Sequence, residues 1–358
     1  MSKKTRLLIV DDSVVFRTCL RSCVNTLADV EVVGAAQNGR DAIVKIKSLK
    51  PDLVTLDMEM PHLNGIEVLE RLQKEAPNVC VLVLSSASET DAERTMQALK
   101  AGAFDFLIKP DPSNKNQKEI LLSMLKEQIS VARSVASVVR QATGVSRSNK
   151  RQTTKAIHTR IAPKARKPDI VAIGSSTGGP MALQKVLTNI PKNFSVPIIV
   201  TQHMPKLFLA SLAKRMNTDS KLECKLIEDG MPLESGCIYV APGEIHTEVE
   251  HVGAKLHAKL VDGPKVHHCK PAVDITFHSL VKLAPRVNTL AIVLTGMGAD
   301  GAAGAKALAD KHAYVIAQDE ASSVVWGMPG ETVRLGAAHE VLPLNEITAA
   351  IIKRCEVG

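Results

Sequence analysis

Aromatic residues are scarce in this 358-residue chain, at 3% of the sequence with a single tryptophan. A nucleic-acid surface built on base stacking needs such side chains, so the sequence gives it little support. Long apolar runs are also missing, and no stretch approaches the roughly 20 residues that span a bilayer. We therefore expect no nucleic-acid partner and no direct membrane insertion.

Paired cysteines are missing too. The seven cysteines are scattered and odd in number, and no C-x-x-C spacing occurs. Cys19 and Cys23 lie one helical turn apart, but no histidines nearby would complete a zinc site. This pattern predicts a reduced, cytoplasmic protein without structural zinc. The N-terminal "MSKKTRLLIVDDS" has too few apolar residues for a signal peptide and is expected to form a strand.

Acidic residues are absent from 128–168, which contains ten Lys or Arg. The beginning of this segment, "ISVARSVASVV", still has helical spacing, whereas 141–168 has no periodicity. We interpret 141–168 as a basic, flexible, exposed linker, and contact with an anionic surface is the alternative. The linker supplies much of the net charge of +8, so that charge says little about the flanking regions.

Strand and helix patterns alternate on both sides of this linker, which favours two α/β domains with parallel sheets. The first domain, 4–122 with its last helix continuing to about 140, suits a flavodoxin-like doubly wound sheet. The second, 169–358, suits a Rossmann-like doubly wound sheet. The predicted strands are 6–10, 30–36, 52–56, 79–85 and 104–108, then 170–174, 196–200, 237–241, 289–294 and 313–317.

Polar side chains follow four strands of the first domain. Asp11 and Asp12 follow the first strand, Asp57 ends the third, and Ser85 and Lys109 follow the fourth and fifth. Ligands of doubly wound sheets bind at these carboxyl ends. Clustered carboxylates repel one another and favour a hard cation such as Mg²⁺, which often bridges to a phosphate. The Asp pair taken alone could instead cap a helix.

The motifs "LLIVDDS", "LVTLDMEMPHLNG", "VLVLSS" and "GAFDFLIKP" resemble the receiver domain of bacterial response regulators. By that resemblance Asp57 is the phospho-acceptor, and Asp12 and Asp57 bind Mg²⁺ together with the backbone carbonyl of Glu59. Asp11 supports the metal indirectly. The resemblance also implies phosphoryl contacts from Ser85 and Lys109 and a switch role for Phe106. Many receivers have Thr in place of Ser85, which keeps the hydroxyl.

The second domain opens with the loop "IGSSTGGP" at 173–180, between a predicted strand and a predicted helix. A glycine-rich loop in this position often cradles a phosphate. The same loop reads G-x-S-x-G around Ser176, the form of a nucleophile turn. Pro180 suits the first turn of the helix. Because serine needs an adjacent base, the loop alone leaves both interpretations open.

Among eleven histidines, only His203 directly follows a buried-looking parallel strand, in "VPIIVTQHMP". His246 is a weaker candidate base. The turn "TLAIVLTGMGADGAAG" carries Asp300, which could orient the base or could simply cap a helix. The other histidines considered are His267 and His268 in a polar loop, and His312 and His339, which we interpret as surface or turn residues.

Ser176, His203 and Asp300 each follow the carboxyl end of a predicted strand and can meet at one crevice. Glycines at 296, 298, 301 and 304 allow close approach of backbone amides, which suits an oxyanion. The chain order Ser, His, Asp differs from that of α/β-hydrolases, so we do not expect that fold.

The motifs "IGSSTGGP", "TQHMP", "YVAPG", "DGPKVHHCKPAVDITFHSL", "LTGMGADGAAG" and "AQDEASSVVWGMP" resemble the catalytic domain of bacterial chemotaxis protein-glutamate methylesterases. The resemblance makes Ser176 the nucleophile, His203 the base and Asp300 the orienting acid. It also points to the Met297 backbone N–H as an oxyanion donor, with Thr177 nearby.

This resemblance implies a phosphorylation-activated serine esterase that acts in chemotactic adaptation. Its substrates would be glutamate methyl esters on methyl-accepting chemoreceptors, which it hydrolyses to glutamate and methanol, and specific receptor glutamines, which it deamidates. A chemotaxis histidine kinase would be the phosphodonor. Mg²⁺ would serve the acidic pocket, and ester hydrolysis would need no cofactor.

The sequence gives less support to three other functions. A DNA-binding response regulator would need a smaller helix-turn-helix effector. A nucleotide- or phosphosugar-binding effector would use "GSSTGG" as a cradle, but the loop lacks the Gly-Lys-Ser/Thr ending of a P-loop and leaves His203 and Asp300 unexplained. An inactive regulatory scaffold would not need three triad residues.

Overall fold

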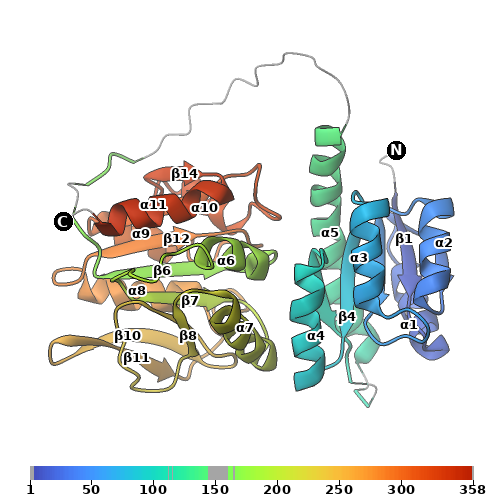
Figure 1. Cartoon of the computed structure of the whole chain (residues 1–358), viewed down its shortest axis with the longest axis horizontal. Helices are drawn as coiled ribbons and strands as arrows, with labels where there is room; N and C mark the ends of the chain where they lie inside the picture. Colours follow the sequence, from blue (N-terminus) through green and yellow to red (C-terminus); the bar gives the residue numbers. More distant parts are fainter. Residues whose placement is uncertain (1–3, 112, 115, 144–159, 164–165, 357–358) are drawn as a thin grey trace. The chain divides into compact units, whose positions relative to one another are not determined.

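The structure is a computed structural model that describes residues 4–111, 113–114, 116–143, 160–163 and 166–356. The chain divides into two compact units, Met1–Ser148 and Asn149–Gly358 (Figure 1). Much of the expected linker, 141–168, lies outside the described residues. Within those residues, no helix combines the length and apolar character that crossing a membrane requires.

The first unit is a five-stranded parallel sheet with strand order β2-β1-β3-β4-β5. This order confirms the predicted flavodoxin-like sheet. Its strands are β1 (Thr5–Val10), β2 (Val30–Ala36), β3 (Leu53–Asp57), β4 (Cys80–Ser85) and β5 (Asp105–Ile108). Its helices are α1 (Val14–Val24), α2 (Gly39–Leu49), α3 (Gly65–Glu75), α4 (Glu89–Lys100) and α5 (Gln117–Thr143).

Short polar side chains begin four of these helices. Ser13, Asn38, Asn64 and Ser88 each accept a hydrogen bond from a backbone N–H of the first turn. At α3 the Glu67 side chain returns the bond to the Asn64 N–H, which completes a capping box. These caps satisfy orphan amides locally and fix each helix start beside the carboxyl edge of the sheet.

The second unit is built on a seven-stranded parallel sheet with strand order β14-β13-β12-β6-β7-β9-β8. This confirms the predicted doubly wound sheet. Its strands are β6 (Ile170–Ser175), β7 (Ile198–Gln202), β8 (Glu223–Leu226), β9 (Cys237–Val240), β12 (Thr289–Val293), β13 (Tyr314–Gln318) and β14 (Glu340–Leu342). Its helices are α6 (Gly179–Leu187), α7 (Lys206–Asp219), α8 (Val273–Leu283), α9 (Ala302–Asp310), α10 (Met328–Arg334) and α11 (Leu344–Glu356).

Four strands of this unit were not predicted. The edge strands β8 and β14 are short and partly exposed, so they lack a continuous apolar run. The other two, β10 (His246–Val252) and β11 (Lys255–Val261), pair antiparallel as a separate hairpin. Each strand has one buried apolar residue, Val249 or Ala258, among residues that are mostly polar or partly exposed. A search for apolar runs overlooks that pattern.

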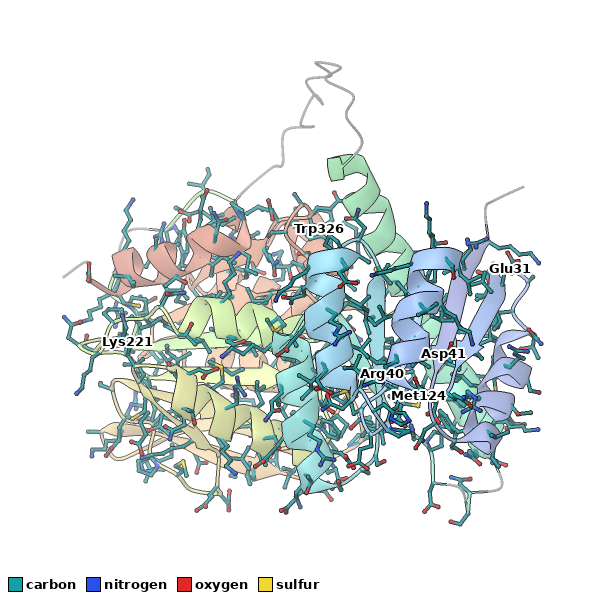
Figure 2. The ribbon with its side chains drawn as sticks, turned by 45° about the vertical axis from the view of Figure 1, so that its right-hand side comes forward. Glu31, Arg40, Asp41, Met124, Lys221 and Trp326 are labelled. Atoms are coloured by element: carbon teal, nitrogen blue, oxygen red, sulfur yellow. The ribbon has the colours of Figure 1, made fainter. Side chains whose placement is uncertain are left out.

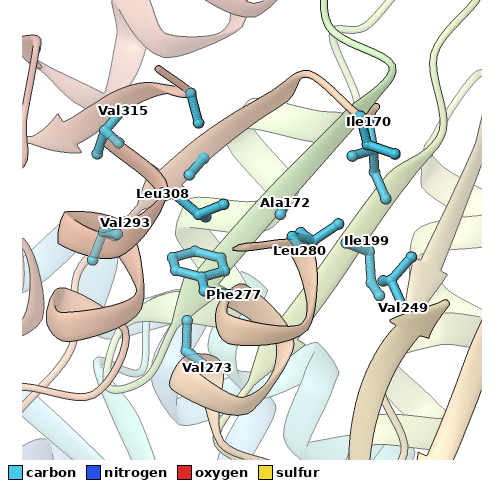
Figure 3. Packing of buried hydrophobic residues seen from close by; sticks show 14 of the residues in the cluster. Ile170, Ala172, Ile199, Val249, Val273, Phe277, Leu280, Val293, Leu308 and Val315 are labelled. Atoms are coloured by element: carbon cyan, nitrogen blue, oxygen red, sulfur yellow. The ribbon is translucent and has the colours of Figure 1, made fainter. Parts of the chain in front are cut away.

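The core of the second unit joins the sheet to helix α8. Figure 3 shows Phe277 and Leu280 of α8 packed among Ala172 of β6, Ile199 of β7 and Leu308 of α9. Phe277 is completely buried, and burial of such a side chain contributes about 2–3 kcal/mol. This packing fixes where α8 begins, which matters for the site because that helix starts at the carboxyl edge of the sheet.

The described end of the expected linker is bonded to the second unit. The Arg160 N–H donates to the Ala338 carbonyl (2.9 Å), and its guanidinium donates to Asp310 (2.7 Å). Further along, the Asn288 side-chain amide donates to the carbonyls of Arg166 (2.9 Å) and Lys167 (3.0 Å). These residues therefore belong structurally with the second unit.

One histidine assignment was wrong. His339 is buried rather than at the surface, because its Nδ1 accepts the Val315 N–H (3.0 Å) and its ring stacks on Tyr314. Burial lowers the pKa of His339 to about 4, helped by the nearby charges of Arg160 and Arg354. His339 is thus a neutral core residue.

The expectation for His312 is confirmed, because it lies exposed in a turn after α9.

The single tryptophan, Trp326, labelled in Figure 2, donates its indole N–H to the Gln318 carbonyl (2.9 Å). It therefore serves the loop after β13 as a hydrogen-bonded anchor.

Candidate active site

The strand order of the second unit changes direction at β6. Strand β7 lies on one side of β6 and β12 on the other, so connections from β6 and β12 run to opposite sides. Doubly wound sheets bind ligands at such a switch point, outside the carboxyl ends of the strands. Ser176 directly follows β6, His203 directly follows β7, and Asp300 lies in the loop after β12.

The backbone around Ser176 is held from both neighbouring loops. The Ser176 N–H donates to the Thr295 carbonyl (3.0 Å), and the Ser176 carbonyl accepts the Gly179 N–H (2.7 Å). Gly178 then begins α6 with a left-handed φ of 74° that favours glycine. A Cβ on Gly296 would lie 2.8 Å from the Ser176 Cβ. Glycine at 296 therefore lets the two loops touch.

Gln202, the last residue of β7, links the serine loop to the histidine. Its Nε2 donates to the carbonyls of Ser176 (2.9 Å) and His203 (3.0 Å), and its Oε1 accepts the Ser175 hydroxyl (2.6 Å). The His203 N–H also donates to the Ser175 carbonyl (3.0 Å). A buried, fully used amide of this kind fixes the separation of the two loops. Its role was not predicted, although it stands directly before His203 in "TQHMP".

The imidazole of His203 and the carboxylate of Asp300 are in direct contact. Nε2 of His203 lies 2.7 Å from Oδ2 of Asp300, and their side chains are 9% and 2% exposed. On the other side of the ring, Nδ1 lies 3.4 Å from the Cys269 thiol. The predicted base and orienting acid are therefore brought together, and a cysteine that the sequence analysis passed over joins them.

Asp300 does more than bind His203. Its Oδ2 also accepts the Val273 N–H (2.7 Å), and its Oδ1 accepts the N–H groups of Asp274 and Gly301 (both 2.9 Å). The alternative that Asp300 simply caps α9, the helix that follows it, does not describe all its contacts, because its carboxylate also caps the start of α8. Burial acts to raise the pKa of Asp300, but His203 and these amides lower it below its usual range.

Asp274 makes the reverse connection. Its Oδ1 accepts the Gly304 N–H in the first turn of α9 (2.7 Å), and its Oδ2 lies 3.1 Å from Nε2 of His267. The start of α8 is thus capped by Asp300, which precedes α9, and the start of α9 is capped by Asp274 of α8. Asp274 was not singled out from sequence, because nothing in "PAVDITF" distinguishes a long-range cap from an ordinary first-turn acid.

The charge of His203 follows from these contacts. Burial alone would lower its pKa, but the hydrogen bond with Asp300 and the contact with Cys269 outweigh burial and raise the pKa to about 9. A buried imidazole beside a carboxylate is stabilised in its protonated form. The group is therefore poised to hold a proton taken from a nucleophile.

The other residues predicted for this site lie near the pair of His203 and Asp300, but not all of them contact it. Within the described residues the Ser176 hydroxyl makes no hydrogen bond with His203. Met297 directly follows Gly296, the glycine packed on Ser176, and is partly exposed. The Thr177 carbonyl accepts the Thr295 hydroxyl (3.0 Å). His246 is buried and structural, since its ring nitrogens meet the Pro264 carbonyl and the Ala272 N–H.

In the first unit, the carboxyl ends of the strands form the expected acidic pocket. Nζ of Lys109 lies 2.8 Å from Asp11 and 3.0 Å from Asp57. Carboxylate oxygens of Asp11, Asp12 and Asp57 all lie within 4.8 Å of one another. One ammonium does not balance three carboxylates, so this donor set fits a hard divalent cation.

Burial raises the pKa of Asp57 to about 6, with Asp11 adding to the rise and Lys109 opposing it. The pKa of Lys109 is raised, because its two carboxylate partners outweigh the effect of burial. Its ammonium also lies over the Phe16 ring, 4.7 Å from the centroid. The lysine is thus held in its charged form at the centre of the pocket.

Other predicted receiver residues surround this cluster. Ser85 is buried, and its hydroxyl accepts the Thr95 hydroxyl (2.8 Å). Phe106 is partly buried on β5. The side chain of Glu59 forms an ion pair with Arg94, at the rim of a hollow that Asp12 also lines. The structure therefore assembles Asp11, Asp12, Asp57 and Lys109, whereas Ser85 and Glu59 lie beside them with other partners.

Comparison with known proteins follows the same division. The model of the response regulator receiver domain matches residues 7–120, and the CheB methylesterase model matches residues 171–351. A solved structure, the CheB methylesterase catalytic domain of Thermotoga maritima, is 40% identical with a TM-score of 0.50. The match covers 52% of this chain and 99% of that one.

Relatives match along the whole chain. A protein-glutamate methylesterase/protein-glutamine glutaminase of Desulfotalea psychrophila is 40% identical over 98% of this chain and 98% of its own length. One of the same description from Nocardioides sp. is 39% identical over 98% of this chain and 95% of its own. The chain therefore belongs to the CheB methylesterase family, with an N-terminal receiver domain. Both resemblances stated from the sequence are confirmed.

Proposed function

We propose that this protein is a protein-glutamate methylesterase and protein-glutamine glutaminase, activated by phosphorylation and acting in chemotactic adaptation. It is a hydrolase whose substrates are glutamate methyl esters and specific glutamines on chemoreceptors. The observation that carries the proposal is the His203–Asp300 contact at the switch point of the sheet, with Ser176 held one strand away. Family membership over the full chain supports the same activity.

Ser176 attacks the ester carbonyl while His203 accepts the serine proton. Asp300 keeps the imidazole in one tautomer and stabilises the imidazolium, and its own orientation is fixed by three backbone amides. The imidazolium then gives this proton to the departing methoxide, which leaves as methanol, and water hydrolyses the acyl-enzyme with help from the same base. Backbone N–H groups beside Ser176, including that of Met297, are proposed to bind the oxyanion, with Thr177 nearby.

We assign the phosphorylation site to Asp57, with the kinase of the chemotaxis pathway as phosphodonor. Asp12, Asp57 and the Glu59 carbonyl would hold Mg²⁺ with indirect help from Asp11, because these carboxylates exceed the single lysine charge. The ion would supply charge neutralisation for phosphoryl transfer. The phosphoryl contacts we propose are Ser85 and Lys109, and the switch residue is Phe106. Ester hydrolysis itself is proposed to proceed without a cofactor.

The remaining assignments follow from this function. We propose a receiver domain over 4–122 with a helix continuing beyond it, a linker over 141–168 and a catalytic domain over 169–358. The two family-model matches flank the proposed linker, and the break between the two compact units falls inside it, although its end is bonded to the second unit. Methyl-accepting chemoreceptors are the proposed substrates, with no nucleic-acid partner and no membrane insertion. A cytoplasmic location is supported by seven cysteines that are all free thiols.

The direct test is methanol release from a methylated receptor by Ser176→Ala and Ser175→Ala variants of the full chain. Ser176→Ala should lower kcat by about 10⁵-fold or more, because the nucleophile is lost. Ser175→Ala loses only the hydrogen bond with Gln202 and should lower kcat by about tenfold. An active Ser176→Ala beside an inactive Ser175→Ala would shift the nucleophile by one residue.

A further inference from the structure

A tight turn at Val266–Cys269 lies over the candidate catalytic histidine. Its ends exchange two backbone hydrogen bonds, of 3.1 and 2.9 Å. The two central residues, His267 and His268, have left-handed φ values of 50° and 64°. Two-residue turns of this form usually contain Asn and Gly, because side chains with a Cβ are strained there. Such strain persists only where the surroundings hold the turn in place.

The surroundings of this turn do hold it. Nε2 of His267 lies 3.1 Å from Oδ2 of Asp274, a carboxylate that is buried and also bonded to the start of α9. Just beyond the turn, the Lys270 carbonyl accepts the Glu244 N–H (3.2 Å), and the Lys270 side chain pairs with Asp262. The turn is therefore fastened to the catalytic unit on both sides, and the side chain of its last residue has a defined position.

That last residue is Cys269, whose Sγ lies 3.4 Å from Nδ1 of His203. Because Nε2 of the same ring is bonded to Asp300, Nδ1 is the nitrogen left to accept a proton from serine. The sulfur of Cys269 faces this nitrogen and accepts a hydrogen bond from it when the ring is protonated. The catalytic nitrogen is therefore engaged by sulfur rather than by Ser176.

We propose that Cys269 is a positioning residue that caps the proton-accepting nitrogen of His203 in the resting enzyme, so that the base acts only when the thiol gives way. This inference rests on the proposed triad of Ser176, His203 and Asp300. It explains a strained turn that otherwise serves no step of ester hydrolysis. It also predicts that the basal esterase runs below the rate its triad would permit.

The titratable neighbours of His203 set the direction of the effect on its pKa. Asp300 faces the ring from the loop after β12, and Cys269 faces it from the turn. Asp274 lies behind Asp300, with His267 and His278 close to it. Asp300 and Cys269 both favour the protonated ring. Removal of the thiol therefore leaves a ring that loses its proton more readily, and more of the base is neutral at pH 7.

The first test compares the pH dependence of methanol release for the full-length wild type, Cys269→Ala and Cys269→Ser. In Cys269→Ala the acidic limb of kcat/KM should move to lower pH by about one unit, with roughly tenfold more activity at pH 7. Cys269→Ser keeps a weakly acidic donor at the same position and should lie between the two. An unchanged limb in Cys269→Ala, or a loss of activity as deep as in Ser176→Ala, overturns the proposal.

The second test modifies the thiol with iodoacetamide, which forms a sulfur–carbon bond and releases iodide. The wild type should lose its esterase activity, because the added group stays over Nδ1, whereas Cys269→Ala should keep its activity. Cys19→Ala is the matched control, since Cys19 is the other partly exposed thiol and lies in the receiver unit. Equal inactivation of the wild type and Cys269→Ala overturns the proposal.

The experiments distinguish failure of the proposed triad from failure of the proposed role of Cys269. Ser176→Ala is measured in the same series. If that variant stays active, the triad is wrong and the role of Cys269 falls with it. If it is inactive while the Cys269→Ala profile equals that of the wild type, the triad stands and only the capping thiol is rejected.

Discussion

Two acidic clusters stand at the carboxyl edges of two parallel sheets in this chain, and they balance their charge in opposite ways. In the receiver unit, Asp11 and Asp57 share one lysine, and Asp12 lies beside them without pairing to it. In the catalytic unit, Asp300 receives three backbone N–H groups and a histidine. The receiver cluster retains negative charge that its lysine does not compensate, which suits a cation. The charge of Asp300 is instead compensated by backbone N–H groups and His203.

The helix starts explain this difference. Receiver helices α1 to α4 are capped by their own serine or asparagine, so their amides need no distant carboxylate. Helices α8 and α9 lack such side-chain caps, and Asp300 and Asp274 supply them from a distance. Self-capped helices therefore accompany the proposed metal site, whereas helices capped from a distance accompany the proposed triad acid.

Asp300→Asn should have the largest effect of the substitutions considered. In Asp300→Asn, one side-chain oxygen becomes an NH₂ group, and either orientation points that donor at backbone N–H groups. We expect kcat for methanol release to fall by about 10⁴-fold, because the imidazole loses its correct tautomer. The free energy of unfolding should fall by about 1–3 kcal/mol from the opposed donors. Denaturant titration measures this loss in the free energy of unfolding. A variant as stable and as active as the wild type would contradict the proposed role of Asp300.

The pH dependence of the esterase rate should reflect the catalytic cluster and not the receiver cluster. Because the folded pKa of His203 is raised to about 9, the neutral base is the minor form at pH 7. Initial rates should rise by about tenfold per pH unit from pH 6 to 8 and level near 9. The stabilising contribution of the protonated ring is fully present below about 6.5 and lost as pH rises through about 9. Asp57→Asn is the control and should show the same profile, since it changes only the receiver.

Asp57→Asn should instead alter regulation. Its basal esterase activity is expected to equal that of the wild type, while activation by a small-molecule phosphodonor with Mg²⁺ disappears. Coupling of this kind between two sites is typically about 5–150-fold, so the activation factor should fall from that range to one. The measurement is methanol release with and without phosphodonor. Full activation of Asp57→Asn would remove Asp57 as the acceptor.

Sequence reasoning reached Asp11, Asp57 and Lys109 because each directly follows an apolar strand, and strand ends converge by topology alone. Ser176 and His203 were found by the same argument. Asp300 lies seven residues beyond Val293, and glycines around it supplied the signal. The fold class followed from alternation of strand and helix patterns.

Other features could not be found in this way. Cys269, Gln202 and Asp274 act through contacts between residues far apart in sequence, and their local patterns resemble ordinary core or loop residues. The hairpin β10–β11 was not predicted because its strands are mostly polar or partly exposed and contain no continuous apolar run. His339 was misjudged for a similar reason: its partners, Val315 and Tyr314, come from a strand more than twenty residues earlier.

The smallest effect expected is at Glu59, and it tests which part of that residue the receiver cluster uses. Glu59→Gln removes the ion pair with Arg94, whose side chains are 66% and 41% exposed. Exposed pairs contribute little, so the free energy of unfolding should change by no more than about 0.5 kcal/mol. Mg²⁺-dependent activation should persist, because the proposed ligand is the backbone carbonyl, which the substitution keeps. Loss of that activation would make the carboxylate itself a ligand and give the receiver cluster four acids, which would widen its contrast with Asp300.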